Sequence, residues 1–168
     1  MLYATLQRWG IGARGSRLLT LREFSASLRD CEQQIVEFES LRIDDIALDV
    51  AGTSRRLMEL IKRLRLVDNK ASLVPCTKAL HHLLPDLVVP VDREYTQRFF
   101  GWHNPEFQSG QDRCYVQAFA AFAEIAQVTS PAQYVRVDSW HTCTAKVIDN
   151  AIVSLLVLAT ELGRDGAG

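Results

Sequence analysis

The stretch PCTKALHHLLPDLVVPVDREYTQRFFGW, residues 75–102, decides how the middle of the chain folds. Its first part predicts a helix over Ser72–Leu84, because leucines recur at helical spacing and proline is well tolerated in a first helical turn. Pro85 and Pro90 then bracket the residues DLVV, and a residue before proline favours extended backbone. The stretch therefore predicts a helix, an extended connection and a second helix in succession.

Asp92 follows the extended connection and is the predicted N-cap of a helix over Arg93–Phe100, which Gly101 ends. The dipole at a helix start keeps such a carboxylate ionised. Asp92 can therefore cap the helix, pair with Lys78, orient a water molecule or act as a general base. Asp92 and Lys78 are the candidate catalytic residues.

Helical spacing of apolar residues also recurs outside this stretch. Thr20 and Glu23 fit a capping box, and the glycines at 10, 12 and 15 predict a turn. The expected helices cover residues 2–9, 20–30 with a continuation over 31–41, 53–67, 72–84, 93–100, 111–128 and 144–162. Residues 102–110 are expected to form a polar loop, and 133–137 a short strand. Because the β–α alternation of a parallel sheet is missing, we expect a mainly α, single-domain helical bundle over residues 1–162, with a flexible tail over 163–168.

The composition is that of an ordinary globular protein. The chain has 168 residues, of which 48% are hydrophobic and 23% charged, so a disordered or fibrous protein is excluded. Its 19 Lys and Arg against 20 Asp and Glu give a formal net charge of −1, which excludes a uniformly basic protein. In a zinc knuckle or a redox pair, roughly two to four residues separate the two cysteines. No two of the four cysteines here lie that close in the sequence. Buried, reduced thiols are expected, and no metal or cofactor is indicated.

The most apolar stretch, Val147–Leu162, is too short for a bilayer and contains Asp149, Asn150 and Ser154. We expect it to be a buried core helix. The first residues lack the basic start and unbroken apolar run of a signal peptide. The sequence therefore predicts a cytoplasmic protein with no membrane partner.

Positive charge is concentrated in the middle of the chain. Residues 55–78 contain seven basic and two acidic side chains, a local charge of +5. On the helix expected over residues 53–67 the basic residues lie mostly away from the apolar face. They form either an ordinary solvated surface or a surface that contacts nucleic-acid phosphates. The candidate nucleic-acid-binding residues are Arg55, Arg56, Lys62, Arg63, Arg65, Lys70 and Arg98.

A second polar block, WHTCTAKVIDN over residues 140–150, precedes the apolar end of the last helix. Lys146, Asp149 and Asn150 share one helix face because they are three or four residues apart. Such a cluster is costly to bury unless its members are paired, so it either satisfies buried backbone groups or lines a cleft. Together with residues of other segments, it gives the candidate pocket: Trp9, His81, Tyr95, Trp140, Lys146, Asp149 and Asn150.

The run T-K-A-L-H-x-L-L-P-x-L-x-x-P-x-D, Thr77 to Asp92, resembles a group of uncharacterised bacterial and archaeal proteins. The early block at 9–17 and a late block around Trp140, Lys146 and residues 148–152 are also similar to that group. More distantly, a helix, an extended segment and an Asp that starts the next helix resemble the helix-hairpin-helix DNA glycosylase superfamily. This resemblance implies a glycosylase-like helical fold, an Asp92 that assists cleavage of the base–sugar bond, and a basic face that holds DNA phosphates. The glycine-rich hairpin turn is replaced here by SLVPCT, residues 72–77. No lysine stands where the Schiff-base enzymes of that superfamily have one, so an Asp-dependent, monofunctional mechanism is implied.

Three functions follow as hypotheses. The first is a nucleic-acid-binding protein with a DNA-glycosylase-like fold that acts on damaged or modified bases. Asp92 would then be its catalytic carboxylate, and Trp9, Tyr95 or Trp102 would stack on the displaced base. The second is a non-catalytic interaction module that forms a homodimer through its apolar helices. The third is a small-molecule enzyme whose pocket holds Lys78, Asp92, Lys146 and Asp149.

Overall fold

The structure, a computed structural model, describes residues 1–11, 16–69, 72–136 and 138–165, the side chains at 106 and 163–165 excepted. Part of the glycine turn expected near residue 12, Lys70, and the last three residues of the expected tail lie outside these ranges. The described part is mainly helical, which confirms the expected fold class. Its elements are α1 (Leu2–Arg8), α2 (Leu21–Asp30), α3 (Glu32–Val36), α4 (Val50–Arg63), α5 (Leu73–Leu83), α6 (Thr96–Phe99), α7 (Asn104–Ser109), α8 (Gln111–Thr129), the 3-10 helix η1 (Pro131–Tyr134) and α9 (Thr144–Asp165).

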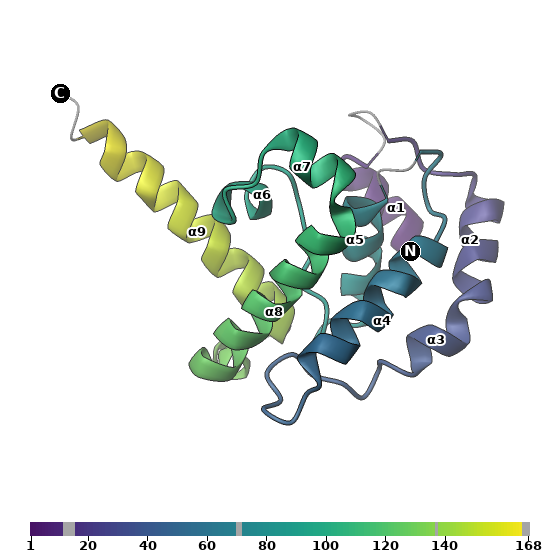
Figure 1. The fold of residues 1–168 in the computed structure, drawn as a ribbon, viewed down its shortest axis with the longest axis horizontal. Helices are drawn as coiled ribbons and strands as arrows, with labels where there is room; N and C mark the ends of the chain where they lie inside the picture. Colours follow the sequence, from purple (N-terminus) through teal and green to yellow (C-terminus); the bar gives the residue numbers. More distant parts are fainter. Residues whose placement is uncertain (12–15, 70–71, 137, 166–168) are drawn as a thin grey trace.

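Helices α4 and α8 lie side by side at the centre of the molecule (Figure 1). α1 packs against α5 on one side of this pair, and α2 and α3 flank α4 at the right of the view. Aromatic side chains of α8 fill the core, because Tyr115, Phe119 and Phe122 are all buried. Burying each such ring contributes about 1.5–3 kcal/mol to stability. The apolar face predicted for α4 meets them with Leu57, Leu60 and Ile61.

The stretch at residues 75–102 forms the expected helix, extended connection and helix start. The connection is fixed to α5 by Thr77, whose hydroxyl accepts a hydrogen bond from the Val91 amide at 3.1 Å. Asp92 was predicted to be the N-cap of the helix, but Tyr95 directly precedes α6. Asp92 instead stabilises the turn before the helix, because its Oδ1 accepts from the amides of Tyr95 at 2.7 Å and Thr96 at 3.2 Å. The helix begins at Thr96 rather than Arg93, since a turn over residues 93–95 precedes it. Gly101 follows α6 at φ +65°, where a side chain would be strained.

Several expected boundaries were wrong for local reasons. The helix expected over residues 31–41 ends at Val36. After it, turns closed by hydrogen bonds between residues three positions apart bring Phe38 into the core. α4 begins before residue 53, since Asp49 accepts a hydrogen bond from the Gly52 amide. The expected polar loop at 102–110 contains α7, whose Phe107 is buried against Trp102. The strand expected at 133–137 is replaced by η1 as far as Tyr134, and residue 137 is not described.

The expectation of a buried last helix was wrong for its second half. Ala145, Ile148 and Ile152 are buried, but Leu158 is 56% exposed and Leu162 is 73% exposed. Figure 1 shows α9 projecting beyond the other helices, so its outer turns lack neighbours that could cover them. None of the described helices is both long and apolar enough to cross a membrane.

Candidate functional site

An open cleft of about 920 Å³ lies where the end of α1, the end of α5, the segment 135–143 and the start of α9 meet. This volume is within the range of small-molecule sites. The cleft brings together segments that are far apart in the sequence. Its lining residues are Trp9, His81, His82, Pro85, Asp86, Val135, Asp138, Ser139, Trp140, Thr142, Cys143 and Lys146.

Four of the predicted pocket residues line this cleft, namely Trp9, His81, Trp140 and Lys146. The other three stand outside the wall. Asp149 holds Lys146 by an ion pair, and Asn150 donates from Nδ2 to the Trp140 carbonyl at 2.9 Å. Tyr95 donates its backbone amide to Asp92, and its carbonyl accepts from the Phe99 amide. The two candidate catalytic residues, Asp92 and Lys78, are not in the lining either.

The pocket residues that sequence reasoning missed come mainly from the segment 135–143. This segment was expected to begin as a strand, and of its side chains only Trp140 was assigned to the candidate pocket. Its signal was a run of polar and aromatic residues between two helices, which is typical of functional loops. Cys143, one of the cysteines expected to be buried, is only half-buried there, whereas Cys31, Cys76 and Cys114 are buried free thiols.

Trp9 forms a fixed aromatic wall of the cleft. Its ring centroid lies 4.8 Å from that of His82 and 6.4 Å from that of His81. The Nζ of Lys78 stands 5.6 Å from the Trp9 ring centroid, a cation–π contact. The indole is therefore held in place by neighbours while about a third of its surface, 36%, stays exposed.

His81 is neutral and has one defined tautomer. Its Nδ1 lies 2.9 Å from the Val88 carbonyl oxygen, and a carbonyl only accepts, so Nδ1 carries the proton. Burial lowers the pKa of His81 to about 4, which outweighs the opposing hydrogen bond to Val88. Burial and the nearby Lys146 also lower the pKa of His82.

Lys146 supplies a cation to the cleft and is held by a carboxylate behind it. Its Nζ donates to Asp149 Oδ2 at 2.5 Å, and the two side chains are 24% and 13% exposed. Burial raises the pKa of Asp149, and the bond to Lys146 works against that rise. Asp92 and Lys78 act on the same carboxyl through their charges, so the other three residues of the small-molecule hypothesis all lie within electrostatic reach of Asp149.

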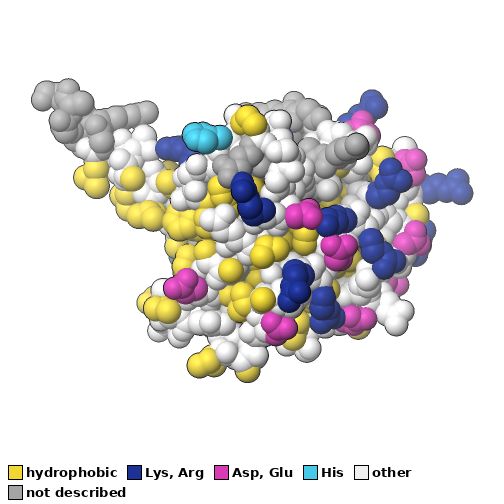
Figure 2. Space-filling model, in the orientation of Figure 1, with side chains coloured by type: hydrophobic (Ala, Val, Ile, Leu, Met, Phe, Trp, Pro, Cys, Tyr) yellow, Lys and Arg dark blue, Asp and Glu magenta, His cyan; other side chains and the backbone are white. Residues whose placement is uncertain are grey.

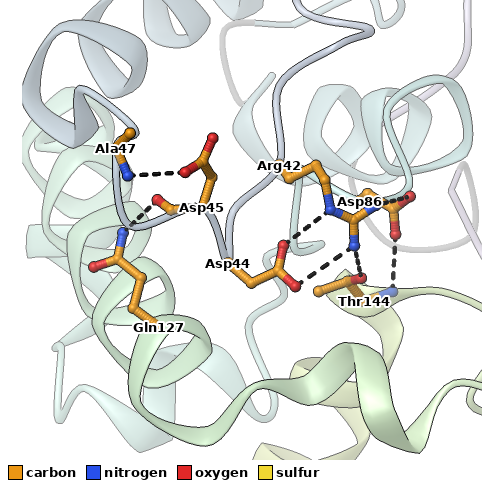
Figure 3. Close-up of polar contacts among 7 residues, drawn as sticks. All are labelled: Arg42, Asp44, Asp45, Ala47, Asp86, Gln127 and Thr144. Atoms are coloured by element: carbon orange, nitrogen blue, oxygen red, sulfur yellow. Dashed lines mark hydrogen bonds and ion pairs between the residues drawn. The ribbon is translucent and has the colours of Figure 1, made fainter.

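Asp86 joins the cleft wall to the start of α9 (Figure 3). Its Oδ1 accepts from the Thr144 amide at 3.2 Å, and its Oδ2 pairs with Arg42 Nη1 at 3.1 Å. Arg42 in turn donates from Nη2 to the Thr144 hydroxyl at 3.1 Å and from Nε to Asp44 at 3.2 Å. Both Asp86 oxygens are thus occupied by groups that fix the wall.

Of the predicted nucleic-acid-binding residues, those that the structure describes do not line the cleft. Arg56 pairs with Glu37 at 2.6 Å, and Lys62 pairs with Glu59 and Asp112. Figure 2 shows Lys and Arg side chains mixed with Asp and Glu on the side of the molecule that carries α2–α4. The local charge of +5 is therefore partly neutralised in the fold. The remaining described candidates, Arg55, Arg63, Arg65 and Arg98, are all exposed. Arg55 donates to the Ala51 carbonyl, and Arg98 donates to Thr160 at 3.4 Å.

The segment that would correspond to a glycosylase hairpin turn, residues 72–77, is helical from Leu73 onward. The Leu73 amide donates to Gln111 Oε1 at 3.0 Å, and the Cys76 amide donates to the Ser72 carbonyl at 2.9 Å. These amides are therefore not available to phosphate groups.

No protein-family model, curated protein or solved structure shows significant similarity to the chain. Within the described ranges, no three His, Cys, Asp or Glu side chains converge as a metal site would require. The described part of the chain is thus mainly helical, with a cleft lined by aromatic, polar and charged side chains.

Proposed function

We propose that the protein binds nucleic acid by taking a single unstacked base into the cleft beside Trp9. The observation that carries this proposal is the exposed indole of Trp9, held by His82 and Lys78 at the edge of a cavity large enough for a nucleotide. Base–aromatic stacking contributes about 1–3 kcal/mol per base and tolerates every base. Trp140, which is 85% exposed, offers a second aromatic surface in the same cleft.

The charges of the cleft favour a single strand or a displaced base over an intact duplex. Lys146 provides a cation for one phosphate, while Asp86 and Asp138 place carboxylates in the same lining. A duplex carries dense phosphate charge along both strands and is bound by continuous basic surfaces. The ion-paired side chains of α4 do not form such a surface.

The resemblance to the DNA glycosylase superfamily extends the proposal to base release, with Asp92 as the carboxylate. Asp92 Oδ1 accepts hydrogen bonds from the backbone amides of Tyr95 and Thr96, which fix the orientation of the carboxyl group. The charge of Asp92 acts on Asp149, and Asp149 forms an ion pair with Lys146 of the cleft lining. Base release is therefore the second activity to test, after binding.

Binding to labelled single-stranded and double-stranded DNA and RNA, measured against salt concentration, tests the proposal. Replacing the exposed Trp140 by Ala should weaken single-strand binding about tenfold, since one stacking surface is lost. Tyr134→Ala is the matched control, because Tyr134 is exposed next to the same segment but does not line the cleft. The double variant Arg63→Glu/Arg65→Glu should change binding much less than Trp140→Ala.

Two results would overturn this proposal: no binding of any strand at low salt, or equal binding by wild type, by Trp140→Ala and by a folded Trp9→Ala variant. If binding is found, release of free base is measured with the wild type and Asp92→Asn. Loss of release in the variant with unchanged binding supports the glycosylase-like activity.

We propose self-association as the alternative role, because the outer part of α9 exposes Leu155, Val157, Leu158 and Leu162. Between residues 153 and 162 Glu161 is the one charged residue, so this surface matches a second apolar surface rather than phosphate. A second copy of the chain offers the same surface by symmetry. Sedimentation should then show a wild-type dimer and a monomeric Leu155→Glu/Leu158→Glu variant of nearly unchanged stability. A wild-type monomer at high concentration contradicts this role.

A further inference from the structure

His81 has one ring nitrogen free to contact a ligand. Its Nδ1–H is committed to the Val88 carbonyl at 2.9 Å, so Nε2 carries a lone pair and no proton. No described residue donates a hydrogen bond to Nε2, and the ring is part of the cleft lining. The cleft therefore contains a neutral hydrogen-bond acceptor in a fixed orientation.

The charged groups of the wall are of a different kind. Lys146 is a donor and a cation, and it suits an anionic group of a ligand. The oxygens of Asp86 are occupied by Arg42 and by the Thr144 amide. Asp138 is exposed to solvent, where a hydrogen bond gains little. His81, which is only 5% exposed, is thus better placed than these two carboxylates to accept a hydrogen bond from a bound group.

We propose that His81 gives the cleft a preference for planar rings that carry an amino group on their edge, such as adenine or cytosine. The Trp9 ring centroid is 6.4 Å from that of His81, so a ring stacked near Trp9 has an edge within reach of Nε2. An amino N–H donates to Nε2, whereas a ring without an edge donor leaves this nitrogen unpaired. The proposal rests on the function proposed above and adds the chemical class of the ligand.

The neutral state of His81 supports this assignment. Burial keeps the pKa of the imidazole far below neutrality, so the acceptor is present across the physiological range. The charged and titratable groups that act on this ring are His82 on the same helix and Lys146 from α9. Both oppose its protonation.

Two matched pairs of single-stranded oligonucleotides test the preference. In one, a central adenine is replaced by purine; in the other, a central cytosine is replaced by 2-pyrimidinone. Each replacement removes the amino group, and neither ring retains an edge donor. Wild type should bind at least one amino-bearing oligonucleotide about five- to tenfold more tightly than its partner, the effect of one hydrogen bond.

His81→Asn is the matched variant. The amide nitrogen of Asn lies as many bonds from the backbone as Nδ1 of His, so it can still donate to Val88, but it has no atom in place of Nε2. This variant should bind both members of each pair equally. The wild-type comparison does not depend on how the variant folds.

The outcomes separate this inference from the proposed function. If both members of each pair bind wild type equally, while Trp140→Ala still weakens binding, the cleft binds bases and the His81 preference is wrong. The same holds if His81→Asn folds and keeps the full preference. If no oligonucleotide binds at low salt, the proposed function fails and the inference with it.

Discussion

Replacing Lys146 by Met is expected to lower the free energy of unfolding by about 2–3 kcal/mol at pH 7. Asp149 is then left without its partner, and its side chain is only 13% exposed. Breaking a buried ion pair on one side costs more than the pair contributes, because an uncompensated charge remains in a poorly solvated place. The expected loss of stability is smaller than that for a fully buried ion pair, because the Lys146 side chain is 24% exposed.

The pH dependence distinguishes this cause from a simple loss of packing. Burial already raises the pKa of Asp149, and removing Lys146 raises it further. The folded variant then binds a proton at a higher pH than the unfolded chain does. The stability that Lys146→Met loses relative to wild type should therefore become smaller as the pH falls. Urea unfolding at pH 7 and pH 5 measures this change.

Two further variants serve as controls for the ion pair. Lys146→Arg keeps the charge and should remain close to wild type. Lys146→Met/Asp149→Asn has no charge left to bury and should recover most of the lost stability. A double variant as unstable as Lys146→Met, or a deficit that does not change with pH, would contradict the explanation.

A local signal in the sequence predicted the capped start of α2. The capping box formed by Thr20 and Glu23 is present, with the Glu23 carboxylate 3.0 Å from the Thr20 amide. This prediction succeeded because a cap depends on residues only three or four positions apart. Asp92 was predicted to cap a helix in the same way, but it accepts from the amides of a turn that precedes α6.

Burial and charge balance could not be predicted in the same way. Apolar composition suggested a buried last helix, but burial also needs a neighbour, and Leu158 and Leu162 have little beside them. The basic run of α4 gave no sign that Arg56 would meet Glu37, or Lys62 meet Asp112. Those partners lie in other segments, and only the tertiary fold brings them together.

The candidate site was predicted in part, because its residue types are unusual where they occur. Trp9, His81 and Lys146 come from three separate segments, and the sequence indicated each as a polar or aromatic residue beside apolar helix. It did not indicate that Asp92 and Lys78 would not be among the residues that line the cleft. That distinction depends on how α5 and α9 pack, which helical periodicity does not determine.

Lowering the pH from 6.5 to 4 is expected to cost the wild type about 3 kcal/mol of stability through His81 alone. Burial lowers the pKa of this imidazole in the folded protein to about 4, and its ordinary value is about 6.5. Between these values the unfolded chain binds a proton that the native protein does not, so stability falls as the pH falls. Below pH 4 both states are protonated and this contribution stops changing.

The comparison of wild type with His81→Asn isolates this effect. His82, whose pKa is also lowered, and Asp149, whose pKa is raised, titrate in both proteins and largely cancel in the difference. His81→Asn starts less stable at pH 7 because part of a buried ring is lost, but the gap between the two proteins should narrow steadily toward pH 4. Chemical denaturation at half-unit pH intervals follows the gap. A gap that stays constant over this range would show that His81 takes up its proton in the folded protein as readily as in the unfolded chain.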